Sequence, residues 1–179
     1  MSLLVVCTGN TCRSVMAGVM LEHLADGRGL LLSVETAGTH AVEGVPPGAR
    51  TLSALRTVRP LAPALGGSAT AAVAHRSRQL RAGDLGRADL VVAMERAHVR
   101  HVRRHHPEAA PRTGLLRTLA RELAPGPGPL GDRVAALALE DVVLDPGDDV
   151  SDPAGHDDDV YAACAGELWT LCSALVSRL

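Results

Sequence analysis

Apolar and polar positions follow two rhythms along the chain: short apolar runs and longer stretches with helical spacing. The runs that predict buried strands are 3–7, 30–38, 89–94 and 113–119, and the stretches that predict helices are 14–28, 47–56, 95–106 and 157–179. Strands that alternate with helices are typical of a parallel sheet covered by helices. The pattern therefore predicts an α/β fold.

Two segments interrupt this alternation. Residues 59–74 and 125–130 are rich in Pro, Gly or Ala and are predicted to be loops. We expect them to lie within one domain spanning residues 1–179, because 179 residues of which 46% are hydrophobic suffice for a single core.

The amino-acid composition excludes or disfavours several classes of partner and chemistry. A net charge of −2 does not favour a nucleic-acid or membrane partner, and no run of eighteen apolar residues or signal-peptide pattern appears, so a cytoplasmic location is predicted. Four cysteines are too few for a disulfide scaffold in a chain of this length. The chain has no lysine, which excludes the lysine-dependent phosphate loop of nucleotide hydrolases and Schiff-base chemistry.

The segment VVCTGNTCRS, residues 5–14, carries the candidate chemistry. Cys7 is predicted to end the first strand, and Arg13 and Ser14 to begin the next helix. Unpaired backbone amides at a helix N-terminus, together with the helix dipole, bind phosphate-sized anions, and the Arg13 guanidinium can hold such an anion bidentately. The same field favours the thiolate of Cys7, which makes this residue a candidate nucleophile.

The composition of the loop itself supports this hypothesis. Asn10 is the only asparagine in the chain, and asparagine tolerates the left-handed backbone that a tightly curled loop needs. The Ser14 hydroxyl is expected to contact the thiolate or to cap the helix. A cysteine at the end of a buried strand is more often only a small core residue. The joint pattern of strand, Cys7, small polar residues, Arg13, Ser14 and helix favours a thiol-based phosphate site.

These residues resemble the low-molecular-weight protein tyrosine phosphatases and their relatives, the protein arginine phosphatases and thioredoxin-coupled arsenate reductases. The resemblance begins at VCTGNTCRS and continues in ETAGTHA at 35–41, AHRSRQL at 74–80, ADLVVAMERAH at 88–98 and VSDPAG at 150–155. It implies a three-layer sandwich with a four-stranded parallel sheet flanked by helices and a phosphate-binding loop after the first strand.

The resemblance also assigns residues. The phosphate-binding loop corresponds to Thr8, Gly9, Asn10, Thr11, Cys12, Arg13 and Ser14, with Asn10, Ser14 and His75 as loop support. The general acid is the Asp of a late Asp-Pro pair. Asp152 is preferred over Asp145, because Tyr161 follows it by nine residues as in the family and the closing helix comes directly after. Catalysis then proceeds through Cys7, Arg13 and Asp152 by way of a phosphocysteine, without a metal or organic cofactor.

The implied substrate is a phosphorylated protein or peptide, most simply phosphotyrosine. Members that act on phosphotyrosine usually flank the pocket with aromatic residues, but this chain has Ala154 after the Asp-Pro pair and HAVEGVPP at 40–47. Thr11 occupies a position where tyrosine phosphatases more often carry an aliphatic residue and arginine phosphatases carry threonine. A protein arginine phosphatase is therefore the first alternative.

Two further alternatives remain. Arsenate reductases use an additional cysteine pair near the middle of the chain, and none lies between Arg13 and Ala163; Cys164 and Cys172 are predicted to be core residues. A non-catalytic oxyanion-binding module is disfavoured because Cys7, Arg13 and Asp152 are all present. Cys12, five residues after Cys7, is a candidate redox partner that captures an oxidised Cys7 as a disulfide.

No metal site is predicted. His98, His101 and His105 have helical spacing, and HDDDV at 156–160 is acidic. A solvated basic helix end and acids at a helix start explain these two groups more simply than metal ligation.

Overall fold

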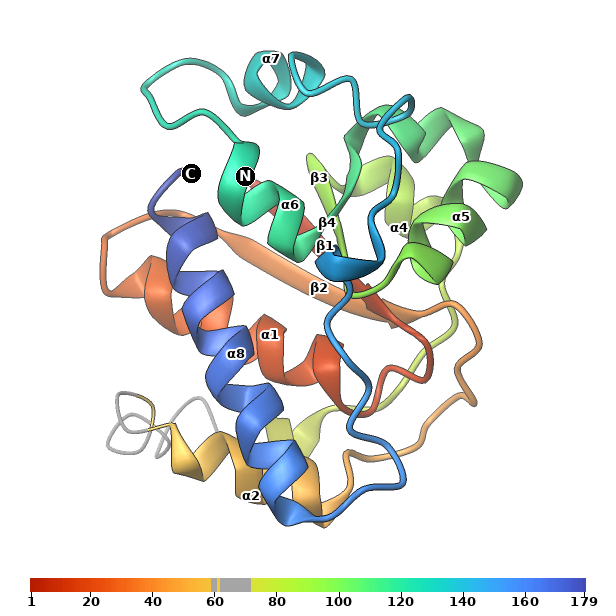
Figure 1. The fold of residues 1–179 in the computed structure, drawn as a ribbon, viewed down its shortest axis with the longest axis vertical. Helices are drawn as coiled ribbons and strands as arrows, with labels where there is room; N and C mark the ends of the chain where they lie inside the picture. The colour runs from red at the N-terminus through yellow and green to blue at the C-terminus, as the bar shows by residue number, and fades with distance from the viewer. Residues whose placement is uncertain (59–60, 62–71) are drawn as a thin grey trace.

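A computed structural model describes residues 1–58, 61 and 72–179 of the chain (Figure 1). Most of the loop predicted at 59–74 lies outside the described residues; within it, residues 72–74 are helical.

Four parallel strands form one sheet in the order β2-β1-β3-β4. They are β1 (Ser2–Cys7), β2 (Ser33–Gly38), β3 (Leu90–Ala93) and β4 (Thr113–Leu115). Val5 on β1 is in register with Thr36 on β2 and Val92 on β3. The predicted four-stranded parallel sheet is therefore confirmed, and β1 lies inside it, paired with β2 on one side and β3 on the other.

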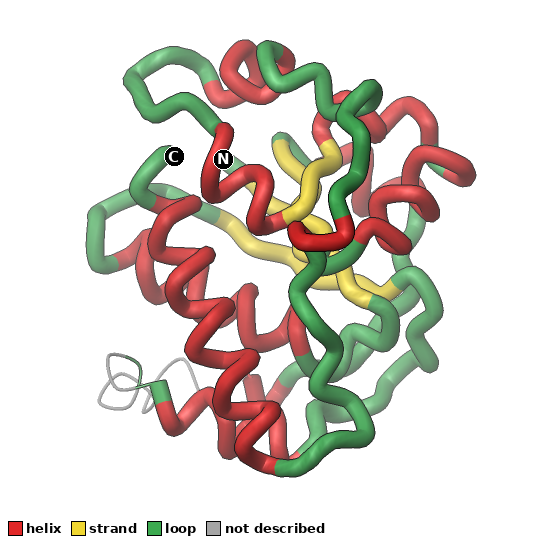
Figure 2. The backbone as a smooth tube through the Cα atoms, viewed as in Figure 1, coloured by secondary structure: helices red, strands yellow, loops and turns green. Residues whose placement is uncertain are grey.

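Helices cover both faces of this sheet. The α-helices are α1 (Arg13–Asp26), α2 (Ala49–Thr57), α4 (Ala82–Arg87), α5 (Arg96–His105), α6 (Leu116–Glu122), α7 (Leu130–Ala135) and α8 (Asp158–Val176), and the 3₁₀ helices are η2 (Pro107–Arg112) and η3 (Pro146–Asp148). Figure 2 shows the strands between the two helical layers. The three-layer sandwich is thus confirmed.

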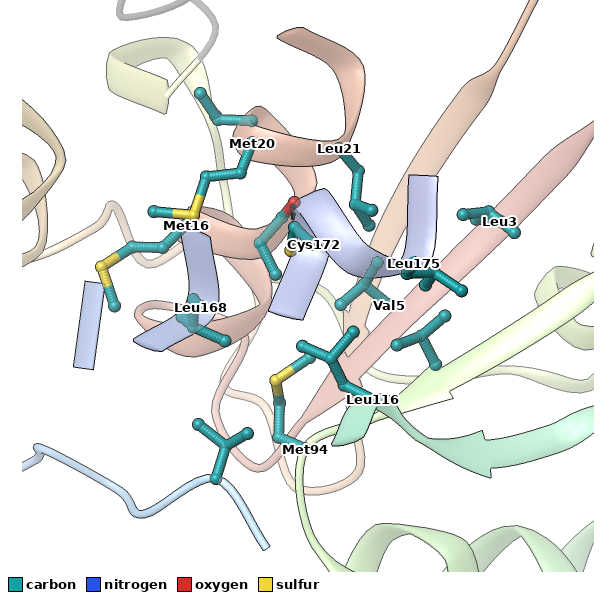
Figure 3. Close-up of a cluster of buried hydrophobic side chains, with 14 of the residues drawn as sticks. Leu3, Val5, Met16, Met20, Leu21, Met94, Leu116, Leu168, Cys172 and Leu175 are labelled. Carbon is teal, nitrogen blue, oxygen red and sulfur yellow. Dashed lines mark hydrogen bonds between the residues drawn. The ribbon is translucent and has the colours of Figure 1, made fainter. Parts of the chain in front are cut away.

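Side chains of β1 point alternately into two cores, as the period of a strand requires. Leu3 and Val5 pack with α1, α6 and α8, whereas Leu4 and Val6 pack with α4 and α5. Figure 3 shows the larger core, in which Met16 and Met20 of α1 lie near Leu168 and Cys172 of α8; the labelled Leu3, Val5, Leu21, Met94, Leu116 and Leu175 belong to the same cluster. Burial of this apolar surface fixes α1, and with it the loop that precedes α1.

The structure corrects several element predictions. The strand predicted at 113–119 ends at Leu115, and α6 begins at Leu116, because a short apolar run is compatible with either a strand or a buried helix. The strand predicted at 30–38 begins only at Ser33. Helices α4 and α7 were not predicted; each has only six residues, too few to show clear helical spacing.

All four strands are parallel, so their carboxyl ends meet at one edge of the sheet. The backbone of the loops there is joined directly: Thr39 N–H donates to Cys7 O across 2.9 Å, and Val150 N–H donates to Met94 O across 2.8 Å. Ligand sites in open α/β sheets lie at this edge. Segments around residues 7, 39, 94 and 150 therefore converge where the sequence predicted the chemistry.

Candidate active site

The predicted phosphate-binding loop curls between the end of β1 and the start of α1. Cys7 is the last residue of β1 and is 3% exposed, and Arg13 is the first residue of α1. Asn10 has a φ of 55°, in the left-handed region that asparagine tolerates. The N-cap residue, Cys12, accepts no side-chain capping bond from the described residues, which leaves the first amides of α1 available to an anion.

The sulfur of Cys7 lies within hydrogen-bond distance of two groups in this loop. Cys7 Sγ and Ser14 Oγ are 3.0 Å apart, and Asn10 N–H donates to Cys7 Sγ across 3.2 Å. Donors aimed at sulfur stabilise its negative charge. Of the two roles expected for Ser14, the structure shows contact with the sulfur.

Asn10 braces the loop through every polar group of its side chain. Its Nδ2 donates to Ser14 Oγ across 3.0 Å and to Thr36 Oγ1 across 2.8 Å, while its Oδ1 accepts the backbone N–H of Arg78 across 3.0 Å. The Asn10 carbonyl lies 2.8 Å from His75 Nε2. Partial burial lowers the pKa of His75, so the neutral ring with Nε2 protonated is the form that donates to this carbonyl.

Gly38, at the end of β2, permits the close approach of this loop. A Cβ at this position would lie 2.5 Å from Thr8 O and 3.1 Å from Asn10 N. Such contacts cannot be accommodated without moving the loop backbone. Gly38 and Thr36 were not singled out in the sequence, because only the register of β2 against β1 shows that they meet the loop.

Arg13 is buried, and its side chain is held by three acceptors from later parts of the chain. Its Nη1 donates to Glu95 Oε1 and, across 2.8 Å, to the carbonyl of Val150. Its Nη2 donates to Asp152 Oδ2 across 2.5 Å. Burial alone would lower the pKa of Arg13, but the bond to Glu95 and the charge of Asp152 outweigh it and raise that pKa, so the guanidinium stays charged.

Glu95 is a site residue that the sequence reasoning missed. It lies two residues after the end of β3 and is the N-cap of α5, which places its carboxylate at the same sheet edge as Cys7. The available signal was a charged residue immediately after the strand predicted at 89–94.

The structure distinguishes the two Asp-Pro pairs. Asp152 binds Arg13, and its Oδ1 accepts the N–H of Ala154 across 3.1 Å. Asp145 is exposed and caps η3 by accepting the N–H of Gly147 across 2.7 Å. Of these two aspartates, Asp152 is the one that lies beside Arg13.

The other predicted loop residues occupy different environments. Thr8 is exposed and its hydroxyl lies 3.0 Å from His98 Nε2, Gly9 and Thr11 are partly exposed, and Thr51 Oγ1 donates to Thr11 O across 3.2 Å. Cys12 is buried, and burial raises the pKa of its thiol to about 11. As predicted, Cys164 and Cys172 are also buried in the core, which raises the pKa of Cys164 to about 12.

The described residues contain no group of three or more His, Cys, Asp or Glu side chains placed to hold a metal ion. The rings of His101 and His105 are 4.7 Å apart, and that of His40 is 5.4 Å from His101, but His98 turns inward to Thr8.

Among the described helices, none has the length and apolarity needed to cross a bilayer.

Comparison with known proteins assigns this arrangement to a family. The family described as low molecular weight phosphotyrosine protein phosphatase matches residues 2–124. The chain belongs to this family. The match includes the whole loop from Cys7 to Ser14 and Glu95, and it ends before Asp152.

One relative extends the likeness to the full chain, and a second covers about two thirds of it. A protein-arginine-phosphatase of Bacillus subtilis is 30% identical over 179 residues, covering 100% of this chain and 97% of its own. A low molecular weight protein-tyrosine-phosphatase of Streptomyces coelicolor is 35% identical over 128 residues, covering 68% of this chain and 70% of its own.

A solved structure adds a chemical observation. The YwlE arginine phosphatase, as a cysteine-to-serine mutant with a phosphorylated active-site serine, matches with a TM-score of 0.75 and 25% identity, covering 100% of this chain and 95% of that chain. The family and these relatives are phosphatases, and a phosphorylated active-site residue in one of them agrees with a cysteine-dependent mechanism.

Proposed function

We propose that this phosphatase hydrolyses a phosphorylated protein side chain through a phosphocysteine at Cys7. The observation that carries the proposal is the convergence of three groups: the Cys7 sulfur bonded by Ser14 and Asn10, the buried Arg13 guanidinium, and the Asp152 carboxylate bound to that guanidinium. Nucleophile, anion clamp and proton donor are the three parts that phosphoryl transfer through a thiol requires.

In the first step, the Cys7 thiolate attacks phosphorus, an S–P bond forms, and the bond from phosphorus to the leaving atom breaks. Asp152 gives its proton to that leaving atom. The amides of the loop and Arg13 bind the nonbridging oxygens as their charge changes. In the second step, water gives a proton to Asp152 and attacks phosphorus, the S–P bond breaks, and inorganic phosphate and the Cys7 thiolate are released.

Arg13 must be shared during this cycle. An incoming phosphoryl dianion competes with Asp152 for Nη2, while Glu95 and the Val150 carbonyl still hold Nη1. We propose that substrate releases Asp152 from Arg13 and frees its carboxyl group to face the leaving atom. Asp152 is suited to such a change because its side chain is 40% exposed, whereas that of Arg13 is 2% exposed.

Phosphoarginine is the favoured substrate. The relative from Bacillus subtilis that is named an arginine phosphatase matches over the full chain, and Thr11 with the non-aromatic Ala154 agrees with a polar leaving group. Phosphotyrosine is the second candidate, supported by the 35% identity to the Streptomyces coelicolor tyrosine phosphatase. Inorganic phosphate is the expected product.

Two predictions from the sequence are kept as proposals: a cytoplasmic location, and a single domain that spans residues 1–179.

One assay separates these candidates. Wild-type protein is incubated with matched phosphoarginine, phosphotyrosine and phosphoserine peptides, and with arsenate plus a thiol reductant, with Cys7→Ser as the control. Phosphate release from the phosphoarginine peptide alone supports the favoured substrate, and release from the phosphotyrosine peptide alone supports the second. Arsenate reduction without phosphate release, or no turnover at all, would refute the phosphatase proposal.

A further inference from the structure

A buried imidazole connects the exposed rim of the phosphate-binding loop to the start of α5. His98 is 1% exposed, and both of its ring nitrogens have partners. Nδ1 lies 3.0 Å from the backbone nitrogen of Glu95, and Nε2 lies 3.0 Å from the hydroxyl oxygen of Thr8. His98 therefore links the residue after the nucleophile to the residue that holds Arg13.

The partners determine where the proton of this ring lies. The backbone N–H of Glu95 can only donate, so Nδ1 must accept. A neutral ring then carries its proton on Nε2 and donates it to Thr8 Oγ1. Burial, together with the positive charge of Arg13, lowers the pKa of His98 to about 3, so the ring is neutral throughout the range in which the enzyme would operate.

This bond leaves Thr8 with unused capacity on its exposed side. A hydroxyl has one hydrogen and two acceptor sites, and His98 occupies one acceptor site. The Thr8 carbonyl is fixed as well, because it accepts the N–H of His40 across 3.0 Å. One acceptor site and the hydrogen of the Thr8 hydroxyl therefore remain available to a ligand. Thr8 is exposed, lies next to Cys7, and is anchored through both its backbone and its side chain.

We infer that His98 is a positioning residue that orients the Thr8 hydroxyl toward the leaving group. A hydroxyl held in this way favours a leaving group that carries N–H donors beside phosphorus over one that is an aryl ring. A guanidinium can donate to the free acceptor site of Thr8 Oγ1, whereas a phenyl ring offers no such donor. The inference rests on the proposed function and deepens its substrate class.

Two amide substitutions divide the roles of the ring. The shorter side-chain amide in His98→Asn reaches the position of Nδ1 and can keep the Glu95 contact, but it does not extend as far as Thr8. The longer amide in His98→Gln reaches the position of Nε2 and can keep the Thr8 contact. If His98 served only to cap α5, His98→Asn would be the better tolerated variant; if it positions Thr8, His98→Gln is.

The test compares a phosphoarginine peptide with nitrophenyl phosphate for wild type, Thr8→Val, His98→Asn, His98→Gln and the double variant Thr8→Val/His98→Asn, with urea unfolding of each. We expect Thr8→Val and His98→Asn to lower the ratio of kcat/KM for phosphoarginine to that for nitrophenyl phosphate about five- to tenfold, the effect of one lost hydrogen bond. His98→Gln should stay within about twofold of wild type, and the double variant should resemble Thr8→Val alone.

Equal losses on both substrates in His98→Asn, or losses that multiply in the double variant, would overturn the inference. The inference would also be overturned if the loss in the kcat/KM ratio across the variants followed their urea midpoints and did not differ between His98→Asn and His98→Gln. Wild-type turnover of nitrophenyl phosphate without any turnover of phosphoarginine would also overturn it and leave the phosphatase function intact, whereas no wild-type turnover of either would refute the proposed function itself.

Discussion

Arg13 and Asp152, 139 positions apart in the sequence, are joined by a hydrogen-bonded ion pair of 2.5 Å between Nη2 and Oδ2. The residue proposed to clamp phosphate thus holds the residue proposed to protonate the leaving group. Because one partner is buried and the other is partly exposed, arrival of a dianion is expected to displace Asp152 and leave Arg13 in place.

Asp152→Asn should slow hydrolysis of a substrate with a poor leaving group by about 10²–10⁴, and that of nitrophenyl phosphate much less, because only the poor leaving group needs a proton in the transition state. Asp145→Asn is the matched control, since it changes the other Asp-Pro pair and removes only the cap of η3. Steady-state kinetics on both substrates check the assignment. The opposite ranking of the two variants would assign the acid to Asp145.

Glu95→Gln should raise KM for phosphorylated substrate and lower kcat/KM about tenfold, because the charge that fixes Arg13 Nη1 is lost while the side chain keeps its size. Glu122→Gln, which removes the charge from a half-exposed pair with Arg121, should change neither constant. Competitive inhibition by inorganic phosphate provides the measurement, since a weaker clamp raises its inhibition constant. An unchanged constant would mean that Arg13 is oriented without Glu95.

Gly38→Ala should destabilise the fold by about 1–3 kcal/mol and lower kcat/KM, because the new methyl group overlaps the Thr8 carbonyl and displaces the loop. Gly86→Ala in α4, where a Cβ meets nothing within 4 Å, should be neutral or slightly stabilising. Urea unfolding and kinetics of the two variants can be compared directly. Wild-type activity in Gly38→Ala would show that the loop tolerates this displacement.

Mild peroxide should convert Cys7 to a sulfenic acid that Cys12 captures, with loss of water and formation of a disulfide that thiols reduce. Burial raises the pKa of Cys12 to about 11. At any pH below that value, the thiolate fraction of Cys12 therefore increases about tenfold for each unit by which the pH rises. Disulfide formation should therefore accelerate as pH rises from 6 to 9, as followed by intact mass. Cys12→Ser should over-oxidise irreversibly; full recovery of this variant by thiol would remove the protective role of Cys12.

The local part of the site was predictable from the sequence, because Cys7, Asn10, Arg13 and Ser14 lie on one continuous strand, loop and helix. Each residue type there carries its own physical reason, such as the left-handed backbone at Asn10. The strand predicted through residue 119 was wrong after Leu115, since an apolar run of that length does not distinguish a strand from a buried helix.

The distant part was not predictable in the same way. Glu95, Gly38 and His98 act on the loop only because parallel strands bring their carboxyl ends to one edge and because β2 lies in register with β1. The place of Glu95 after a predicted strand was a usable signal for that residue. The sequence around Gly38 and His98 gives no indication of their contacts with the loop. The preference for Asp152 over Asp145 came from resemblance, and its contact with Arg13 supplies an independent reason for it.

The central claim is that Cys7 is the nucleophile and carries the phosphoryl group. The most direct measurement is rapid acid quenching of Asp152→Asn during turnover of nitrophenyl phosphate, followed by intact-mass and peptide analysis, with Cys7→Ser/Asp152→Asn treated in parallel. The mechanism predicts a mass gain of one phosphoryl group on the peptide containing Cys7, because the first step proceeds while the second lacks its base. Continued phosphate release with no phosphorylated Cys7, or equal turnover by the double variant, would contradict it.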